Sequence, residues 1–421
     1  MTQPSEFAPS GAKYPPRWEF IAICAGLMAL NALAIDIMLP GLQQIGASLG
    51  VADENHRQFV IPAYFLGMAA GLLFYGPASD RFGRRGPLFF GLAIYIIAAT
   101  AAAFAPTFEI LLALRVVQGI GAASTRVIAV SIVRDRFGGR AMAEVMSLIF
   151  MVFMVIPIIA PNIGQLVLLF GDWHEIFLVM AGIAVLIVAW TWIRMPESQH
   201  PQDRRPIDIR SVFSGFGIVL SNRFSFWYTI ASTILFGALF GFINSAQQVY
   251  DGIYGLGVLF PLVFAGIGAM MAVSSFLNSR LVGKIGMRRL SHGALLGFTT
   301  VSVIWFVLSL LGPIPFWLFL LLFAVAMFQF GWIGSNFNAI SMEPLGHIAG
   351  TAASVQGFIQ TLGGAAIGTF IGQSFNGTVT PLAAGFCAVG LAGLVCVLIA
   401  EKGKLFAAPG AGKPAVAAAP H

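Results

Sequence analysis

The chain has 421 residues, of which 58% are apolar and only 10% are charged, and its mean hydropathy is +0.87. Soluble proteins carry about 25% charged residues, so this composition excludes a water-soluble enzyme and a disordered chain and predicts a protein embedded in lipid. The net charge of +6 has to be explained by membrane topology before nucleic-acid binding is considered. The three cysteines lie in apolar stretches without a Cys/His cluster, so we expect neither a metal nor any other cofactor.

The apolar residues fall into twelve runs, each close to the roughly 20 residues that one helix needs to cross a bilayer. This pattern predicts an all-α integral membrane protein with twelve transmembrane helices. The runs lie near residues 18–40, 58–78, 87–105, 108–132, 141–169, 175–194, 223–248, 257–279, 291–311, 316–342, 351–372 and 380–400.

The Lys and Arg residues are distributed unequally between the two sides of these runs. Twenty of the 23 lie in the tails and in alternate loops, Arg57 alone lies in the other loops, and two lie inside a run. The positive-inside rule therefore predicts that both termini are cytoplasmic, and it explains the net charge without nucleic acid. We expect cytoplasmic tails at 1–17 and 401–421, helix bundles at 18–194 and 223–400, and a cytoplasmic linker at 195–222.

The two halves of the chain resemble each other at one position. SDRFGRR (79–85) follows the second run and GKIGMRR (283–289) follows the eighth, so that Arg81 and Gly83 correspond to Lys284 and Gly286. Two parallel repeats are typical of transporters that hold their substrate between two rocking halves.

Asp36 is the one acidic residue that we place within a span, because the other acids lie at or beyond the ends of the runs or in the N-terminal tail. A charge at the centre of a membrane helix costs about 2.5–3.5 kcal/mol on insertion scales, so its presence needs a reason. One interpretation is a carboxyl group that faces a cavity and takes up and releases a proton. The other is that Asp36 only reaches the outer interface, because Pro40 ends the helix soon after it.

Two arginines lie inside the fourth run. Arg115 is expected at about the same depth as Asp36, where an arginine pairs with an acid, with a substrate oxygen or, as a static strut, with backbone carbonyls. Arg126 follows eleven residues later on roughly the same helix face. It either extends the positive charge of a cavity towards the cytoplasm or reaches the inner interface.

Amides and aromatic residues interrupt several runs, and such a mixture suits a partly hydrophobic organic ligand. In the fifth run, prolines remove backbone donors and permit a hinge at Pro157, Pro161 and Gly164. The candidate cavity residues are Tyr64, Arg126, Phe153, Phe240, Asn244, Gln247, Gln329, Trp332, Asn336 and Gln360.

Several segments resemble a known family. GPASDRFGRRGPLFFG (76–91) is similar to the signature loop of the major facilitator superfamily, LLALRVVQGIGAAS to its fourth-span motif, and IPIIAPNIGQ to the fifth-span motif of its drug–proton antiporters. Together with AIDIMLPGL and SVQGFIQTLGGAAIG, they make the chain look most like the Bcr/CflA group of bacterial multidrug exporters.

The resemblance implies two six-helix bundles in the bacterial inner membrane and proton-driven efflux of drugs and antibiotics. It implies that Arg115 and Gln118 take part in proton coupling and that Asp36 takes part in coupling and substrate sensing. It also implies a cytoplasmic gate that latches the outward-open state, formed by Gly76, Asp80, Arg81, Gly83, Arg84 and Arg85.

We therefore predict a monomeric antiporter in which a proton from the outer side binds Asp36 as its bond to Arg115 loosens, and substrate later displaces that proton. Because Arg115 would neutralise Asp36, neutral or weakly polar substrates are expected to outrank dications. Proton-coupled uptake of a metabolite is one alternative, and a sensor or scaffold that transports nothing is another. The direction of accumulation separates the first from export, and a lack of proton release on ligand addition would identify the second.

Overall fold

The computed structural model describes residues 14–204 and 209–406, and within these ranges the chain is helical without strands. Each of the twelve expected runs corresponds to a long helix, so the predicted fold class is confirmed. The helices are α1 (Arg17–Asp36), α4 (Val60–Phe82), α5 (Arg85–Ala102), α6 (Phe108–Arg136), α7 (Gly139–Phe170), α8 (Trp173–Arg194), α10 (Arg223–Gln247), α11 (Phe260–Ile285), α12 (Met287–Leu311), α13 (Phe316–Met342), α14 (Ala349–Gln373) and α15 (Thr380–Ala400).

Ten helical segments of the described residues are long and apolar enough to cross a membrane. The other two long helices, α7 and α14, have 32 and 25 residues, which also exceeds the length that a bilayer requires. Many large apolar side chains on the outside are exposed, among them Phe74, Phe90 and Leu186. An outward-facing apolar surface of this kind is expected where lipid, and not water, surrounds the helices.

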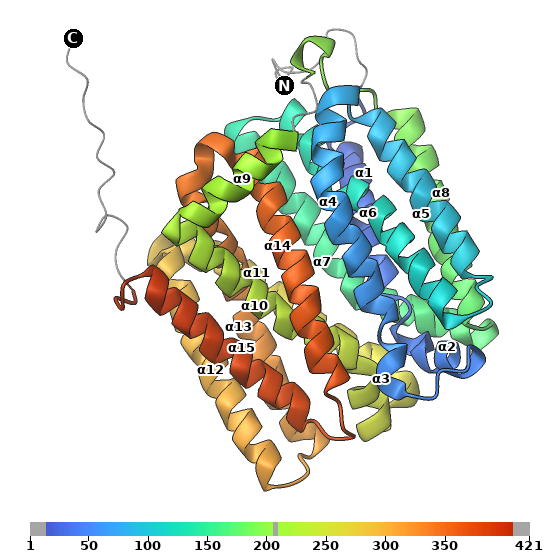
Figure 1. Cartoon of the computed structure of the whole chain (residues 1–421), viewed down its shortest axis with the longest axis vertical. Helices are drawn as coiled ribbons and strands as arrows, with labels where there is room; N and C mark the ends of the chain where they lie inside the picture. The colour runs from blue at the N-terminus through green and yellow to red at the C-terminus, as the bar shows by residue number, and fades with distance from the viewer. Residues whose placement is uncertain (1–13, 205–208, 407–421) are drawn as a thin grey trace.

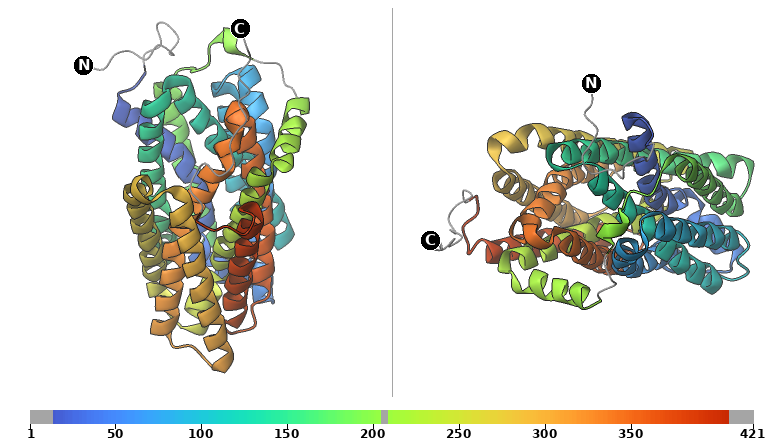
Figure 2. Two further views of the ribbon diagram at one scale, coloured as in Figure 1. Left: turned by 90° about the vertical axis from the view of Figure 1, so that its left-hand side faces the viewer. Right: turned by 90° about the horizontal axis from the view of Figure 1, so that it is seen from above.

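The helices form two bundles that follow each other in the chain (Figures 1 and 2). In the first bundle α6 packs against α4 and α5, and in the second α10 packs against α14 and α15. The bundles meet where α4 lies beside α14 and where α7 lies beside α11. The space between the halves is therefore bounded on its two flanks by these helix pairs.

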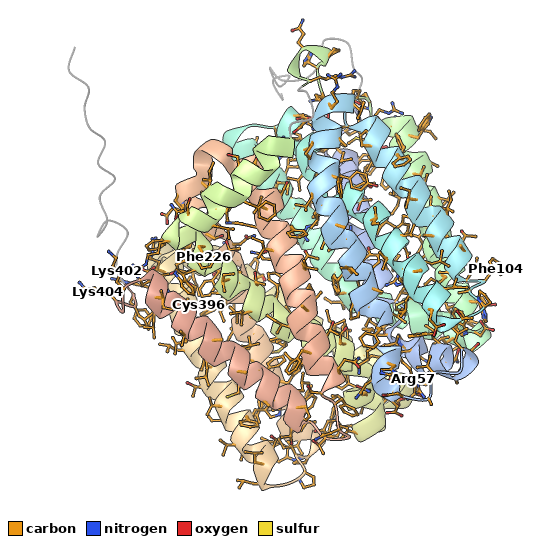
Figure 3. All side chains as sticks on the ribbon, in the orientation of Figure 1. Arg57, Phe104, Phe226, Cys396, Lys402 and Lys404 are labelled. Carbon is orange, nitrogen blue, oxygen red and sulfur yellow. The ribbon has the colours of Figure 1, made fainter. Side chains whose placement is uncertain are left out.

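Short elements distinguish the two ends of the molecule. The start of α1, the α4–α5 loop and residues 195–204 lie at one end, which we call the linker face. At the other end, the far face, lie α2 (Leu42–Ser48) and α3 (Glu54–Arg57) (Figure 1). Arg57, the last residue of α3, lies on the far face, away from Lys402 and Lys404, which follow α15 (Figure 3).

Two short helical segments lie within residues 195–222, the segment predicted to be a cytoplasmic linker. Pro201–Asp203 forms a 3-10 turn, and α9 (Ile209–Ser221) is a helix of 13 residues that packs against α14. Apolar residues recur on one face of α9, which explains why it lies on the bundle.

The repeat seen in the sequence is also present in the backbone. Gly83 ends α4 with φ of +89°, and Gly286 ends α11 with φ of +93°. A residue with a Cβ adopts this conformation only with strain, so glycine closes the helix at both places. The next helix of each bundle begins two residues after Gly83 and one residue after Gly286.

Candidate functional site

Asp36 lies where the first transmembrane helix breaks. It is the last residue of α1, and after one turn the chain continues as a 3-10 segment, Leu39–Gly41, and then as α2. Its side chain is only 4% exposed, and its Oδ1 has no hydrogen-bond partner within residues 14–204 and 209–406. The structure thus places the Asp36 side chain inside the protein.

This environment favours a neutral carboxyl group. A buried carboxylate without a partner is costly, and the C-terminal end of a helix carries a partial negative charge that repels an anion. Interrupted transmembrane helices commonly mark ion and substrate sites, because the unwound turn frees backbone groups. Asp36 therefore has the surroundings of a group that binds a proton when the site is closed.

Arg115 is fully buried but does not bond to Asp36. Its Nη2 donates to Ala34 O at 2.9 Å, its Nε to Val60 O at 3.2 Å and its Nη1 to Gln118 Oε1 at 2.7 Å. The expected ion pair is therefore absent from this conformation. Ala34 lies in the last turn of α1, where carbonyls have no partner within the helix, and the guanidinium satisfies one of them. Arg115 here is a strut between α1 and α4.

A polar cluster adjoins this strut. The Tyr64 ring lies 4.6 Å from the guanidinium of Arg115, and its hydroxyl donates to Asn31 Oδ1 at 3.2 Å. Asn31 Nδ2 in turn donates to Thr125 Oγ1 of α6 at 2.8 Å. Tyr64 is among the residues predicted from the sequence to line the cavity, whereas Asn31 is not. The signal was present, because Asn31 is a polar residue in an apolar run five residues before Asp36.

Helix α7 contacts the break of α1 directly. Pro157 and Pro161 lie inside α7 without ending it. A Cβ atom at Gly164 would lie 1.9 Å from the backbone oxygen of Ile37, so only glycine permits this approach. The three predicted hinge residues therefore share one helix, and Gly164 touches the residue next to Asp36. Their hinge function stays a prediction.

The signature loop on the linker face is built around one buried arginine. Arg84 is 3% exposed, and its Nη1 lies 2.6 Å from Asp80 Oδ1 while its Nε lies 2.8 Å from Asp135 Oδ2. Glu197 accepts hydrogen bonds from the backbone N–H groups of Arg84 and Arg85 at 2.8 and 3.0 Å. Asp135 and Glu197 were not predicted as members of this network. Both are distant from Arg84 in the chain, and both resemble ordinary acidic residues at helix ends.

The remaining residues of the predicted gate have different surroundings. The Arg81 side chain is exposed, whereas the Arg85 guanidinium donates to Trp192 O at 3.0 Å and lies over the Trp192 ring. Gly76 faces α14, and a Cβ there would lie 3.7 Å from Ser354 Oγ. The loop is thus placed beside the other half, but its function as a gate stays a prediction.

Hydrogen bonds join the two halves on the far face. Asn55 Nδ2 donates to the backbone oxygens of Gln373 and Phe375 at 3.2 and 3.0 Å, and Gln248 Nε2 donates to Asn55 Oδ1 at 2.8 Å. Gln58 also bonds to Gln248. Below these amides the rings of Phe65 and Phe240 stack across the boundary with centroids 4.1 Å apart. We call this group the far-face closure.

The residues predicted to line the cavity do not form one cluster. Phe240 lies between the halves, and Asn244 Oδ1 and Gln360 Nε2 are buried without hydrogen-bond partners among the described residues. Gln247 is buried at the end of α10, and Arg126 is exposed. The Phe153 side chain lies outside the described residues.

Three of these residues instead connect helices of the second bundle. Trp332 Nε1 donates to Ser274 O at 2.9 Å, and Asn336 Nδ2 donates to Asn278 Oδ1 at 2.7 Å, so both tie α13 to α11. Gln329 lies against Gly297 of α12. Polarity in an apolar run suggested a cavity position for them, but a polar side chain also serves as a bond between packed helices.

Comparison with known proteins places the chain in a family. Residues 21–369 match the family model described as Major Facilitator Superfamily. The chain belongs to the major facilitator superfamily. The same helical architecture occurs in the xylose transporter XylE from Escherichia coli, captured in a partially occluded inward-open conformation. Its TM-score is 0.72 at 14% identity, with 94% of this chain and 99% of that chain covered, so the likeness concerns the fold alone.

Two curated relatives within the superfamily carry functional names. The bicyclomycin resistance protein homolog of Haemophilus influenzae is 31% identical over 364 residues, which cover 86% of this chain and 91% of the relative. The multidrug resistance protein MdtL of Escherichia coli is 32% identical over 261 residues, which cover 61% of this chain and 64% of the relative.

Proposed function

We propose that this protein exports small, partly hydrophobic organic compounds of the antibiotic type across the bacterial inner membrane in exchange for protons. The names of the two relatives support drug export, and the superfamily supports a transporter rather than an enzyme. The excess of Lys and Arg supports a cytoplasmic linker face with both termini on that side. One chain supplies both halves around the site, which supports a monomer as the working unit.

Asp36 is the observation that carries proton coupling. In the proposed cycle the far-face closure opens, Asp36 exchanges its proton with the outer side, and the protonated form allows the closed conformation described here. Deprotonation would leave a bare carboxylate at the end of α1, and the unwound turn would have to move to solvate it. Because Arg115 bonds to Ala34 O in the same turn, such a movement would also change the strut to α4.

Asp36→Asn separates coupling from transport. In everted membrane vesicles, whose lumen corresponds to the outer side, an acidic lumen should drive the wild-type protein to accumulate bicyclomycin. One pH unit supplies about 1.4 kcal/mol per proton, which corresponds to roughly a tenfold concentration ratio. Asp36→Asn should lose this gradient-driven accumulation and keep exchange of labelled for unlabelled drug, because asparagine fits the neutral site but does not titrate.

Glu109→Gln is the matched control, since Glu109 is an exposed acid at the far-face start of α6. It should behave as wild type. Full gradient-driven accumulation by Asp36→Asn would show that another group couples the proton, and wild-type flux that ignores the gradient would refute antiport. Drug loss from a preloaded acidic lumen, coupled to the exit of protons, would instead establish uptake by symport.

A further inference from the structure

The direction of Arg126 on its helix can be derived from helical geometry. The exposed side of α6 carries Ile110, Ala113 and Val117. Arg126 follows Val117 by nine residues, which at 3.6 residues per turn places it about 180° around the helix. Yet Arg126 is also exposed. Its side chain therefore reaches an accessible space on the inner side of the bundle and not the lipid.

The neighbours of α6 identify this space. Arg115, eleven residues before Arg126, points in nearly the same direction and reaches α1 at Ala34 O and α4 at Val60 O. Arg126 therefore projects between α1 and α4 as well. Because α4 packs on α14, and α7 beside α1 packs on α11, the space in front of Arg126 is enclosed between the two halves.

No acidic side chain compensates this positive charge among the described residues. Asn31 and Thr125, which lie next to it across the α1–α6 contact, are neutral and bonded to each other. Asp36 lies five residues further along α1, about 7.5 Å nearer the far face. The acids at the linker-face ends of nearby helices already have partners: Glu19 with Arg194, Glu144 with Arg17, and Asp80 and Asp135 with Arg84.

We infer that Arg126 binds a carboxylate on the transported compound. A guanidinium presents a planar set of donors that matches a carboxylate, and in an enclosed site this contact is only weakly screened by solvent. Phe240 and Phe236, whose rings lie 6.1 Å apart near the boundary of the halves, offer apolar contact to the rest of such a molecule. This inference rests on the proposed function and gives it a preference for amphiphilic organic acids over the neutral compounds expected from the sequence.

The test compares an acid with its neutral isostere. Dansylglycine and dansylglycinamide share one fluorescent, partly hydrophobic scaffold and differ in a single carboxylate. Binding of each to the purified full-length protein in nanodiscs is measured by dansyl fluorescence. Wild type should bind the acid about tenfold more tightly than the amide, which equals about 1.4 kcal/mol. Arg126→Gln should reduce that ratio to about one without weakening amide binding, and Arg126→Lys should keep part of it.

Arg134→Gln is the control, because it removes the same charge from an exposed position two turns further along α6. It should keep the wild-type ratio. The inference is overturned if the wild-type protein binds neither compound or binds the acid no more tightly than the amide. It is also overturned if Arg126→Gln keeps the wild-type preference for the acid. Because the assay needs no gradient, its failure leaves proton-driven export of bicyclomycin untouched, and failure of that export would not alter the binding ratio.

Discussion

The backbone of one helix dictates the residue at a single position of another. Gly164 of α7 lies so close to the break of α1 that a methyl group would overlap Ile37 O. Gly164→Ala must therefore push α7 away from the turn that follows Asp36. We expect a loss of roughly 1–3 kcal/mol, the usual cost of forcing extra atoms into a packed core, and with it a lower midpoint of thermal unfolding and little drug export.

Gly182→Ala in α8 is the matched control, because a Cβ there meets nothing within 4 Å. It should unfold at the wild-type temperature or slightly above, since alanine restricts the unfolded chain. Thermal unfolding of the purified proteins and export from cells measure both effects. A Gly164→Ala protein as stable and active as Gly182→Ala would show that the close contact between α7 and α1 does not persist in the membrane.

At the same scale, residue type was more predictable than residue pairing. Asp36 and Arg115 could be identified from the cost of charge in lipid, since few reasons justify such residues in an apolar run. Whether Asp36 and Arg115 form an ion pair could not be predicted from that cost. The partners of Arg115 depend on which backbone carbonyls are left free at the end of α1. Asn31 and Glu197 were missed because their partners, Thr125 and the backbone of Arg84, are distant in sequence.

The far-face closure is a property of elements, because it joins α3 and α4 to the segments that follow α10 and α14. Its polar contacts are made by neutral amides, each worth about 0.5–1.5 kcal/mol net. We expect the double variant Asn55→Ala/Gln248→Ala to shift the population towards a state open on the far face, since about 1.4 kcal/mol changes a two-state ratio tenfold.

The separation of the halves can be measured by double electron–electron resonance between two spin labels. The labels are placed at Ser48 and Val258, which are exposed on the far face, one in each half. The double variant should populate longer distances than wild type. Asn376→Ala is the control, because Asn376 bonds only within its own loop, to Thr378. An unchanged distance distribution in the double variant would mean that the side chains of Asn55 and Gln248 do not hold the far face closed.

Helices could be predicted where the length of an apolar run determines them. Helix ends that depend on packing between distant segments could not. The length of a run fixes a transmembrane helix, and all twelve runs became helices with ends displaced by a few residues. The first run was expected to extend to Pro40, but α1 ends at Asp36. Pro40 supplies a local cause for the break, because it has no N–H to bond Asp36 O in a continuing helix. The contact with Gly164 lies 128 positions away and is visible only in the fold.

On the scale of the whole molecule, the two halves repeat an ionic cluster as well as a glycine. Arg288 lies 2.9 Å from Glu343 and 3.1 Å from Glu401 in the second half, as Arg84 lies close to Asp80 and Asp135 in the first. Both arginines follow the glycine with positive φ that ends a helix, Gly83 or Gly286. Each half is thus fastened internally on the linker face, which suits halves that move as rigid bodies around a site between them.

Rigid halves that exchange a proton for a substrate must also move charge. One proton inward for one neutral molecule outward transfers one positive charge, worth about 2.3 kcal/mol at 100 mV, and a monoanion outward doubles that transfer. In everted vesicles without a pH gradient, a potassium diffusion potential that is positive inside should therefore drive accumulation of both compounds. The accumulation of dansylglycine should depend on voltage about twice as strongly as that of dansylglycinamide. Collapse of the potential with potassium on both sides is the control. Accumulation that ignores the voltage for both compounds would exclude this stoichiometry, and equal dependence for acid and amide would show that the acid is carried in its neutral form.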